Sequence, residues 1–480
     1  MSRSKLHLIE KKLDTKTPIL IGFEGVTLTP DLAIHLEKIN PIGVILFRRN
    51  ITSFGQTAQL VTEIKLLLGD VLIGIDQEGG AVERLGELAI PSQFSLSKKR
   101  LVAEATKIQA SLLASLGINL NFAPVLDLYD ANSPVINLRA FSADPIEVAN
   151  CGVESITAHL KSGVTPCPKH FPGHGRSLED SHFSAATLQK TQEELENAEL
   201  IPFQAAIDSS CPMIMSAHLW VPSLDPEYPA TLSKKILGDL LRVKMGYQGL
   251  VISDCLEMAA TEDSYSPAEM VRLGRLAGLD IWMSSFSLKG SLEFQLELAT
   301  ELKIQPNEES QKRVQAFLAN LPQLQPAIPS EKDIFALYEA SLIQGGEGLK
   351  FTSGIICCSL GNQNVSGVNA GQKQHPFLTR LNETTLAIKV SKAINRPADL
   401  KSLITLANAE NALLLLVSSD AFLRPDWNPE DFSLESAKNS LHIALKSPLD
   451  LRLEAKNYWG LQGYNATGSK FLVNKLLGLQ

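Results

Sequence analysis

The chain has 480 residues, which is too long for one compact core, so two domains are expected. Its hydrophobic fraction of 44% and charged fraction of 20% are those of an ordinary globular protein. The formal net charge of -8 is modest for this length and argues against a nucleic-acid-binding surface.

The N-terminal residues and the cysteines of the chain indicate its cellular compartment. Residues 1–14 are charged and lack the apolar core of a signal peptide, and no later stretch is long and apolar enough to cross a bilayer. The six cysteines form neither a disulfide framework nor a zinc knuckle, which predicts buried thiols in a reducing compartment. We therefore expect a cytoplasmic protein without a membrane span, with residues 1–17 as an N-terminal extension.

From Pro18 to about Lys303, short apolar runs alternate with amphipathic segments. The runs are rich in Ile, Val and Leu, which is typical of strands covered on both faces. The expected strands are Ile19–Phe23, Val44–Phe47, Val71–Asp76, Leu120–Leu126, Val164–His170, Met213–His218, Leu250–Asp254 and Ile281–Ser284. The expected helices are Phe54–Leu68, Lys99–Leu116, Ile146–Ser162, Gln192–Ser209, Lys234–Lys244 and Pro267–Ala277.

Eight strands, each followed by a helix, predict a (β/α)₈ TIM-like barrel over residues 18–304. The alternative is a doubly wound open sheet. That fold needs a nucleotide-type glycine loop after the first strand, which Gly22-Phe23-Glu24-Gly25 does not supply.

The remainder of the chain predicts a second, smaller domain. Residues 305–345 are expected to form a helical connector, and 346–480 a C-terminal α/β domain of sandwich type. Its expected strands are Gly354–Leu360, Thr385–Val390 and Ala412–Val417, and its expected helix is Leu434–Leu445.

Polar residues gather where the predicted barrel strands end, which is where barrel enzymes place their active sites. These residues are Asp76, Asp127, Arg139, Lys169, His170, His218 and Asp254. Several have a structural explanation when taken alone, such as a turn former for Asp76, a cap for Asp127 or Asp254, and a surface ion pair for Arg139. Lys169 and His170 are harder to explain in this way, because adjacent side chains of an extended segment point to opposite sides and need two polar environments. Their joint placement favours a functional site.

The segment from Lys169 to Gly175, followed by Asp180-Ser181-His182, carries three histidines on a Gly/Pro-rich loop. Pro172, Gly173 and Gly175 prevent this segment from forming a helix. A histidine with an aspartate two residues away is a natural proton-transfer pair.

Two chemistries remain open at this point. A metal-dependent barrel hydrolase is one, although His170-x-x-x-His174 lacks the helix that its ligand spacing needs. The other is a two-step displacement at an acetal carbon. In it Asp254 is the nucleophile, His182 the proton donor and acceptor, and Asp180 its orienting partner.

The sequence resembles glycoside hydrolase family 3, in its β-N-acetylglucosaminidase (β-hexosaminidase) branch, over most of Pro18 to about Ser285. The motifs that carry the resemblance are Gly43–Phe47, Asp76–Gly80, Phe122–Asp127, Ser133–Ile136, Arg139 with Phe141-Ser142, Lys169–Gly175, Asp180–His182 and Ser253-Asp254. The resemblance implies a retaining exo-β-N-acetylglucosaminidase without cofactor or metal, with terminal N-acetylglucosamine as its carbohydrate substrate. In a cytoplasmic bacterial member, peptidoglycan-derived muropeptides would supply this sugar.

The resemblance also implies residue roles. Asp254 matches the nucleophile, and His182 with Asp180 matches the acid/base pair. The residues that match the sugar-binding positions are Asp76, Arg84, Arg139, Lys169 and His170.

Three positions depart from the family pattern: Ala81 replaces the arginine of Gly-Gly-Arg, Leu138 replaces an aspartate, and Cys255 replaces the second aspartate at the nucleophile. Losing that carboxylate is expected to ease ionisation of Asp254 and to cost some of its orientation. A family 3 β-glycosidase of other sugar specificity and a catalytically weakened sugar-binding barrel remain alternatives.

Overall fold

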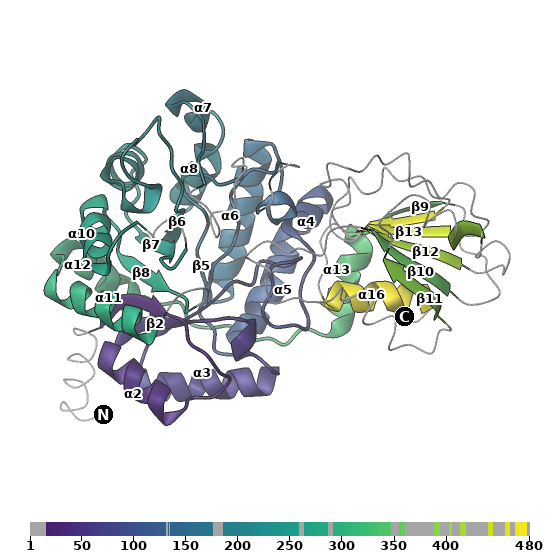
Figure 1. Ribbon diagram of the computed structural model, residues 1–480, viewed down its shortest axis with the longest axis horizontal. Helices are drawn as coiled ribbons and strands as arrows, with labels where there is room; N and C mark the ends of the chain where they lie inside the picture. The colour runs from purple at the N-terminus through teal and green to yellow at the C-terminus, as the bar shows by residue number, and fades with distance from the viewer. Residues whose placement is uncertain are drawn as a thin grey trace. The chain divides into compact units, whose positions relative to one another are not determined.

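The computed structural model shows a barrel and a second, smaller α/β unit (Figure 1). It describes residues 16–130, 133, 135–175, 186–258, 264–286, 291–346, 355–360, 388–393, 403–405, 413–418, 440–444, 457–460 and 466–477. One compact unit comprises Met1–Glu78 and Val102–Pro329, and the other comprises Gly79–Leu101 and Ser330–Gln480.

The first unit contains an eight-stranded parallel sheet with the order β5-β4-β3-β2-β1-β8-β7-β6. Its strands are β1 (Thr17–Ile21), β2 (Pro41–Leu46), β3 (Leu72–Ile75), β4 (Leu120–Asn121), β5 (Thr165–Pro166), β6 (Met213–Ser216), β7 (Leu250–Cys255) and β8 (Ile281–Ser284). The predicted barrel is confirmed, and each strand begins within a few residues of its expected position.

Strands β4 and β5 are much shorter than the expected Leu120–Leu126 and Val164–His170. Prolines 124, 166 and 168 lack the N–H that a strand ladder needs, so regular pairing stops early. Pairing resumes at an isolated parallel bridge between Val125 and Lys169. Cis peptide bonds occur at Ala123–Pro124, Lys169–His170 and Phe171–Pro172.

The segment after β5 closes the barrel against β6. The backbone N of Phe171 donates to Met215 O over 2.9 Å, and the N of Ala217 donates to Phe171 O over 2.8 Å. Met215 N also donates to Pro168 O over 2.9 Å. The loop that carries Lys169 and His170 is therefore built into the barrel wall.

Helices cover the outside of the strands. They are α2 (Pro30–Ile39), α3 (Phe54–Leu68), α5 (Val102–Ser115), α6 (Pro145–Lys161), α7 (Gln192–Glu196), α8 (Leu200–Asp208), η4 (Lys234–Lys244), α10 (Pro267–Ala277), α11 (Leu292–Ile304) and α12 (Glu308–Ala319). Capping boxes begin α7 at Thr191 and α10 at Ser266. The expected helix Gln192–Ser209 is divided into α7 and α8. None of the helices in the described part of the chain has the length and apolar character that crossing a bilayer requires.

The barrel core is formed by apolar side chains from the strands, including Leu20, Ile45, Phe122, Met215 and Ile252. Helix α12 joins this core through Val314 and Leu318. The expected connector 305–345 is therefore divided, because α12 belongs to the barrel unit and α13 (Glu331–Ser341) to the second unit.

The second unit contains a six-stranded sheet with the order β11-β10-β12-β13-β14-β9. Its strands are β9 (Ile343–Gly346), β10 (Ile355–Leu360), β11 (Ile388–Ala393), β12 (Leu413–Ser418), β13 (Ser440–Ala444) and β14 (Asn457–Gly460), and its helices include α4 (Gln93–Lys99), α13 and α16 (Ala466–Leu477). All pairings are parallel except that of β9 with β14.

The prediction of a helix over Leu434–Leu445 is wrong for Ser440–Ala444, which form β13. Apolar Leu441 and Ile443 alternate with polar neighbours there, and this period of two suits a strand. Tertiary pairing with β12 and β14 overrides the helical preference of the surrounding residues.

Candidate active site

The predicted polar residues of the barrel follow the carboxyl ends of its parallel strands. Asp76 follows β3, and Arg139 ends the short 3₁₀ helix η2 (Asn137–Arg139) beyond β4. Lys169 and His170 follow β5, and Asp254 is the penultimate residue of β7. Because all eight strands run in the same direction, these side chains belong to one end of the barrel.

Glu78 is the centre of a buried charge network. Its side chain is 1% exposed, and Arg139 binds it with two hydrogen bonds of 2.8 Å, from Nε and Nη2. Lys169 Nζ lies 2.6 Å from Glu78 Oε1 and 2.7 Å from Asp76 Oδ1. The carboxylate of Asp76 is 16% exposed and is the part of the network most open to a ligand.

The network keeps Glu78, Arg139 and Lys169 charged. Burial by itself would raise the pKa of Glu78, but the charges and hydrogen bonds of Arg139 and Lys169 hold it well below its usual range. Burial by itself would lower the pKa values of Arg139 and Lys169, and the carboxylates beside them raise both instead. Two buried cations and a partly exposed carboxylate are thus pre-oriented for neutral hydroxyl groups.

Asp127 organises the histidine loop. His170 Nδ1 lies 2.6 Å from Asp127 Oδ2, and the backbone N of His174 donates to Asp127 Oδ1 over 2.6 Å. Burial raises the pKa of Asp127, but the charge and hydrogen bond of His170 outweigh this and lower it. Burial lowers the pKa of His174 to about 4, so its ring is neutral at pH 7. Lys169 and His170 therefore lie in two separate polar environments, the first beside Asp76 and Glu78 and the second beside Asp127.

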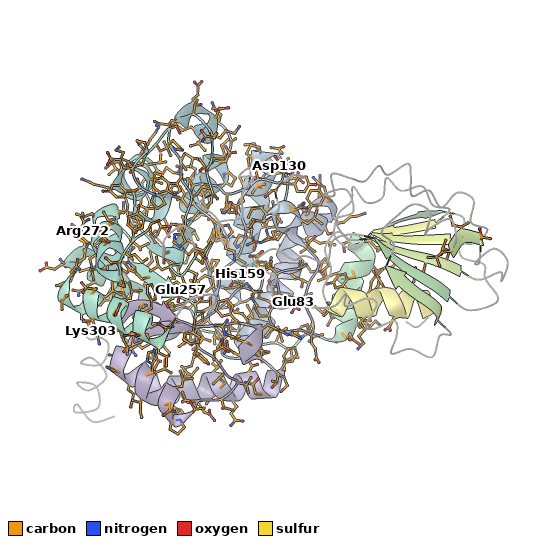
Figure 2. The ribbon with its side chains drawn as sticks, viewed as in Figure 1. Glu83, Asp130, His159, Glu257, Arg272 and Lys303 are labelled. Carbon is orange, nitrogen blue, oxygen red and sulfur yellow. The ribbon has the colours of Figure 1, made fainter. Side chains whose placement is uncertain are left out.

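The loop after β3 is held by Asn121 on β4. Its Nδ2 donates to Gln77 O over 2.9 Å, and its Oδ1 accepts from Gln77 N over 3.0 Å. The same Nδ2 lies 3.0 Å from His159 Nε2, and burial lowers the pKa of His159 to about 4 (Figure 2). A neutral imidazole accepts this hydrogen bond and fixes the loop that carries Asp76 and Glu78.

Cys167, which follows β5, is fully buried. Burial and Cys211 raise the pKa of its thiol, the charge of Lys169 lowers it, and the charges of Asp76 and Asp254 raise it. Asp254 belongs to the same barrel end as Asp76 and Lys169, because β7 runs in the same direction as β3 and β5. The half-buried carboxylate of Asp254 also accepts a hydrogen bond of 2.7 Å from the backbone N of Cys255.

Not every predicted residue joins this constellation. Asp180 and His182 lie outside the described residues. Arg84 belongs to the segment Gly79–Leu101 of the second unit, so its sugar-binding role stays a prediction. His218 follows β6, and its Nε2 hydrogen-bonds the backbone O of Cys255 over 2.9 Å.

Sequence reasoning missed the roles of Glu78, Asp127 and Glu257. Glu78 lies in the motif Asp76–Gly80. Its position between a buried strand and a Gly-Gly turn is the signal from which its role could have been predicted. Asp127 had been interpreted as a cap. Glu257, two residues after Cys255, gave no signal in the sequence.

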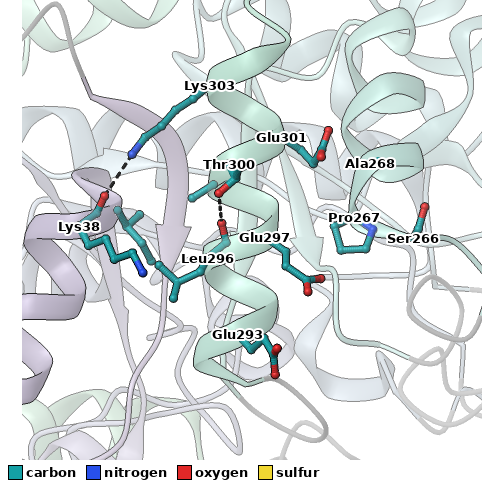
Figure 3. A pocket seen from close by; sticks show the side chains of 12 residues that line it. Lys38, Ser266, Pro267, Ala268, Glu293, Leu296, Glu297, Thr300, Glu301 and Lys303 are labelled. Atoms are coloured by element: carbon teal, nitrogen blue, oxygen red, sulfur yellow. Dashed lines mark hydrogen bonds between the residues drawn. The ribbon is translucent and has the colours of Figure 1, made fainter.

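A metal site and a surface groove are the two alternatives to this strand-end site. Within the described ranges, no three His, Cys, Asp or Glu side chains are grouped so as to hold a metal ion. A surface groove of about 580 Å³ lies among the outer helices α2, α10 and α11 (Figure 3). It is lined by Lys38, Glu293, Glu297 and Lys303 among others, and no member of the Glu78 network lines it.

Comparisons with known proteins agree with this architecture. The Glycosyl hydrolase family 3 N terminal domain matches residues 21–317. Beta-hexosaminidase A of Pseudoalteromonas piscicida is 30% identical over 353 residues, and the match spans 66% of this chain and 58% of that relative. A beta-hexosaminidase of Thiobacillus denitrificans is 35% identical over 279 residues, or 56% of this chain and 77% of the relative.

A solved structure covers nearly the whole chain. The glycoside hydrolase family 3 β-N-acetylglucosaminidase from Paenibacillus sp. str. FPU-7 matches with a TM-score of 0.81 and 26% identity, over 97% of this chain and 96% of that one. The expected resemblance is therefore confirmed by sequence and by fold. The chain belongs to glycoside hydrolase family 3.

Proposed function

We propose that the protein is a retaining exo-β-N-acetylglucosaminidase. The observation that carries the proposal is the position of Asp254 near the carboxyl end of β7, at the same end of the parallel barrel as Asp76 and Lys169. A carboxylate next to a pre-oriented set of hydroxyl-binding groups suits attack on a bound sugar. The names of the hexosaminidase relatives support N-acetylglucosamine as that sugar.

In this proposal the charge network and its neighbours grip the terminal sugar. The partly exposed Asp76 accepts from sugar hydroxyl groups, and Lys169 and Arg139 donate to them from positions set by Glu78. His170, oriented by Asp127, completes the set. The family resemblance alone adds Arg84 as a sugar-binding residue. Because most of these groups are already buried and paired, binding needs little reorganisation.

The first chemical step forms a covalent intermediate. A carboxylate oxygen of Asp254 attacks the anomeric carbon as the glycosidic C–O bond breaks, and the leaving oxygen takes a proton from His182. Asp180 orients the His182 ring and stabilises its charged form before the transfer.

The second step releases the sugar. A water oxygen attacks the anomeric carbon from the side that the leaving group vacated, and His182 takes the proton of that water. The bond to Asp254 breaks, the carboxylate is restored, and the product keeps the β configuration.

The natural substrates in this proposal are peptidoglycan-derived muropeptides inside the cell, which carry terminal β-linked N-acetylglucosamine. Their recycling would occur in the cytoplasm. Support for this part comes from the family resemblance and the cysteine pattern.

The proposal is tested with an aryl β-N-acetylglucosaminide and the variants Asp254→Asn and His182→Ala. We expect Asp254→Asn to lower turnover by at least about 10³-fold, because it removes the nucleophile without changing its size. We expect His182→Ala to remove the limb of the pH–rate profile that the acid/base group produces. A 5-fluoro N-acetylglucosaminyl fluoride should label the peptide that contains Asp254, as seen by mass spectrometry.

Several outcomes would contradict the proposal. They are near-parental turnover in Asp254→Asn, an inverted first product by NMR, and loss of activity with a chelator that added metal restores. Binding of the sugar without release of the aryl alcohol by the parental protein would point to a sugar-binding barrel instead.

A further inference from the structure

A β-bulge lies at the predicted nucleophile. Ile252 on β7 pairs with Ile281 on β8, and the next pair is Cys255 with Met283, so two residues of β7 stand opposite one of β8. The backbone N of Met283 donates to the Ser253 side chain over 2.9 Å at this point. A bulge redirects the side chains of the strand that contains it, here that of Asp254.

Cys255, the residue after Asp254, is held from two sides. Its backbone O accepts a hydrogen bond of 2.9 Å from His218 Nε2. Its Sγ donates to Glu257 Oε2 over 2.6 Å and lies 2.6 Å from Ser285 Oγ. These contacts hold Cys255 in place, and the N–H of the peptide that joins Asp254 to Cys255 donates to the Asp254 carboxylate.

Glu257 links this peptide to the end of β8. It is 1% exposed, and both its carboxylate oxygens accept hydrogen bonds (Figure 2). Beyond the Cys255 thiol, its donors are Ser284 Oγ, Ser285 N at 3.0 Å and Phe286 N at 3.2 Å. One buried carboxylate thus ties the bulged end of β7 to the loop after β8.

We propose that Glu257 is a positioning residue that sets the orientation of Asp254 through the Cys255 thiol. This inference rests on the proposed function of Asp254 as nucleophile. Glu257 takes the place of the carboxylate that the family pattern puts at position 255, and it reaches the same strand end from two residues further along the chain.

The thiol is suited to this role because a carboxylate needs a donor. Burial raises the pKa of Cys255, and the charge of Glu257 raises it further, so the thiol keeps its proton. An aspartate at position 255 would instead place a second carboxylate against Glu257, which like-charge repulsion disfavours.

The first test compares Cys255→Ala with Cys255→Ser, using the aryl substrate. Cys255→Ala removes one donor to Glu257 and leaves the other three, so the fold should hold. We expect kcat to fall about 10- to 100-fold with little change in KM, since misplacement of a reacting group acts on the chemical step. Cys255→Ser keeps a donor and should retain most of the parental kcat.

The second test is Glu257→Gln, matched by Glu297→Gln on the exposed face of α11. The glutamine keeps the size but presents N–H groups to donors, so we expect the same loss of kcat, while Glu297→Gln stays parental. In an Asp254→Gly background with azide as the nucleophile, Glu257→Gln should have no further effect, because there is no aspartate left to orient.

Unchanged kcat in Cys255→Ala, or an equal loss from Glu257→Gln with and without Asp254, would overturn the inference. Absence of aryl release by the parental protein would overturn the proposed function instead, so the two failures can be told apart. The variant Cys255→Asp gives a last check. By itself it should lower kcat. In combination with Glu257→Gln, kcat should recover, because the glutamine amide can donate to the new carboxylate.

Discussion

Two charge clusters at opposite ends of the barrel strands each place one buried acidic side chain between two cations. At the carboxyl ends of the strands, Glu78 binds Arg139 and Lys169. At the amino end of β8, Asp280 binds Arg242 and Arg313. Each acidic side chain is almost fully buried between two cations.

The difference lies in what else the clusters contact. Asp280 also accepts from the backbone N of Val251 over 2.9 Å, and Arg242 donates to Gly249 O over 2.6 Å, so these charges tie β7, β8, η4 and α12 together. The Glu78 cluster instead extends to Asp76, which reaches the surface. A buried charge cluster therefore does not by itself indicate an active site. Its location at the carboxyl ends of the barrel strands does.

The largest expected effect comes from Glu78→Gln, because it changes both stability and activity. Removing the carboxylate leaves two buried cations without their shared partner, which costs about 3–5 kcal/mol of unfolding free energy. Turnover per folded molecule should fall as well, since Arg139 and Lys169 lose their orientation. Urea denaturation and steady-state kinetics measure the two effects, and loss of stability with parental kcat/KM would remove the network from the site.

Asp280→Asn should cost a similar amount of stability, about 3–5 kcal/mol, and leave kcat and KM of the folded fraction unchanged. Glu196→Gln, which breaks the exposed pair with Lys244, is the matched control and should leave the free energy of unfolding nearly unchanged, because solvent screens an exposed pair. A change in KM for Asp280→Asn would erase the proposed distinction between the two clusters.

The last expected effect is a pH dependence of stability from His159 and His174. Each has a folded pKa of about 4, below the usual value of about 6.5, so the unfolded chain binds more protons between these values. The contribution of each histidine to the free energy of unfolding is therefore fully present above about pH 6.5. It is lost as the pH falls toward 4, by about 1.4 kcal/mol per pH unit for each group. Denaturation of His159→Gln should show a shallower slope than the parental protein, and an unchanged slope would contradict the assignment.

Local pattern was sufficient for much of the barrel. Helices α3 and α10 and strand β8 have the predicted bounds, because amphipathic periodicity, caps and short apolar runs depend on neighbours within one turn or strand. The same patterns put Asp76, Lys169 and Asp254 at strand ends. A parallel barrel then brings those ends together without further information.

Tertiary structure alone decided which of these residues support the others. Glu78 meets Arg139, Asp127 meets His170, and Glu257 meets the end of β8 only because the barrel closes, and no pattern within a strand or turn encodes such pairs. The strand at Ser440–Ala444 was likewise determined by pairing with its neighbours in the sheet. Burial and hydrogen-bond partners are properties of the folded packing, so the roles that depend on them become visible only there.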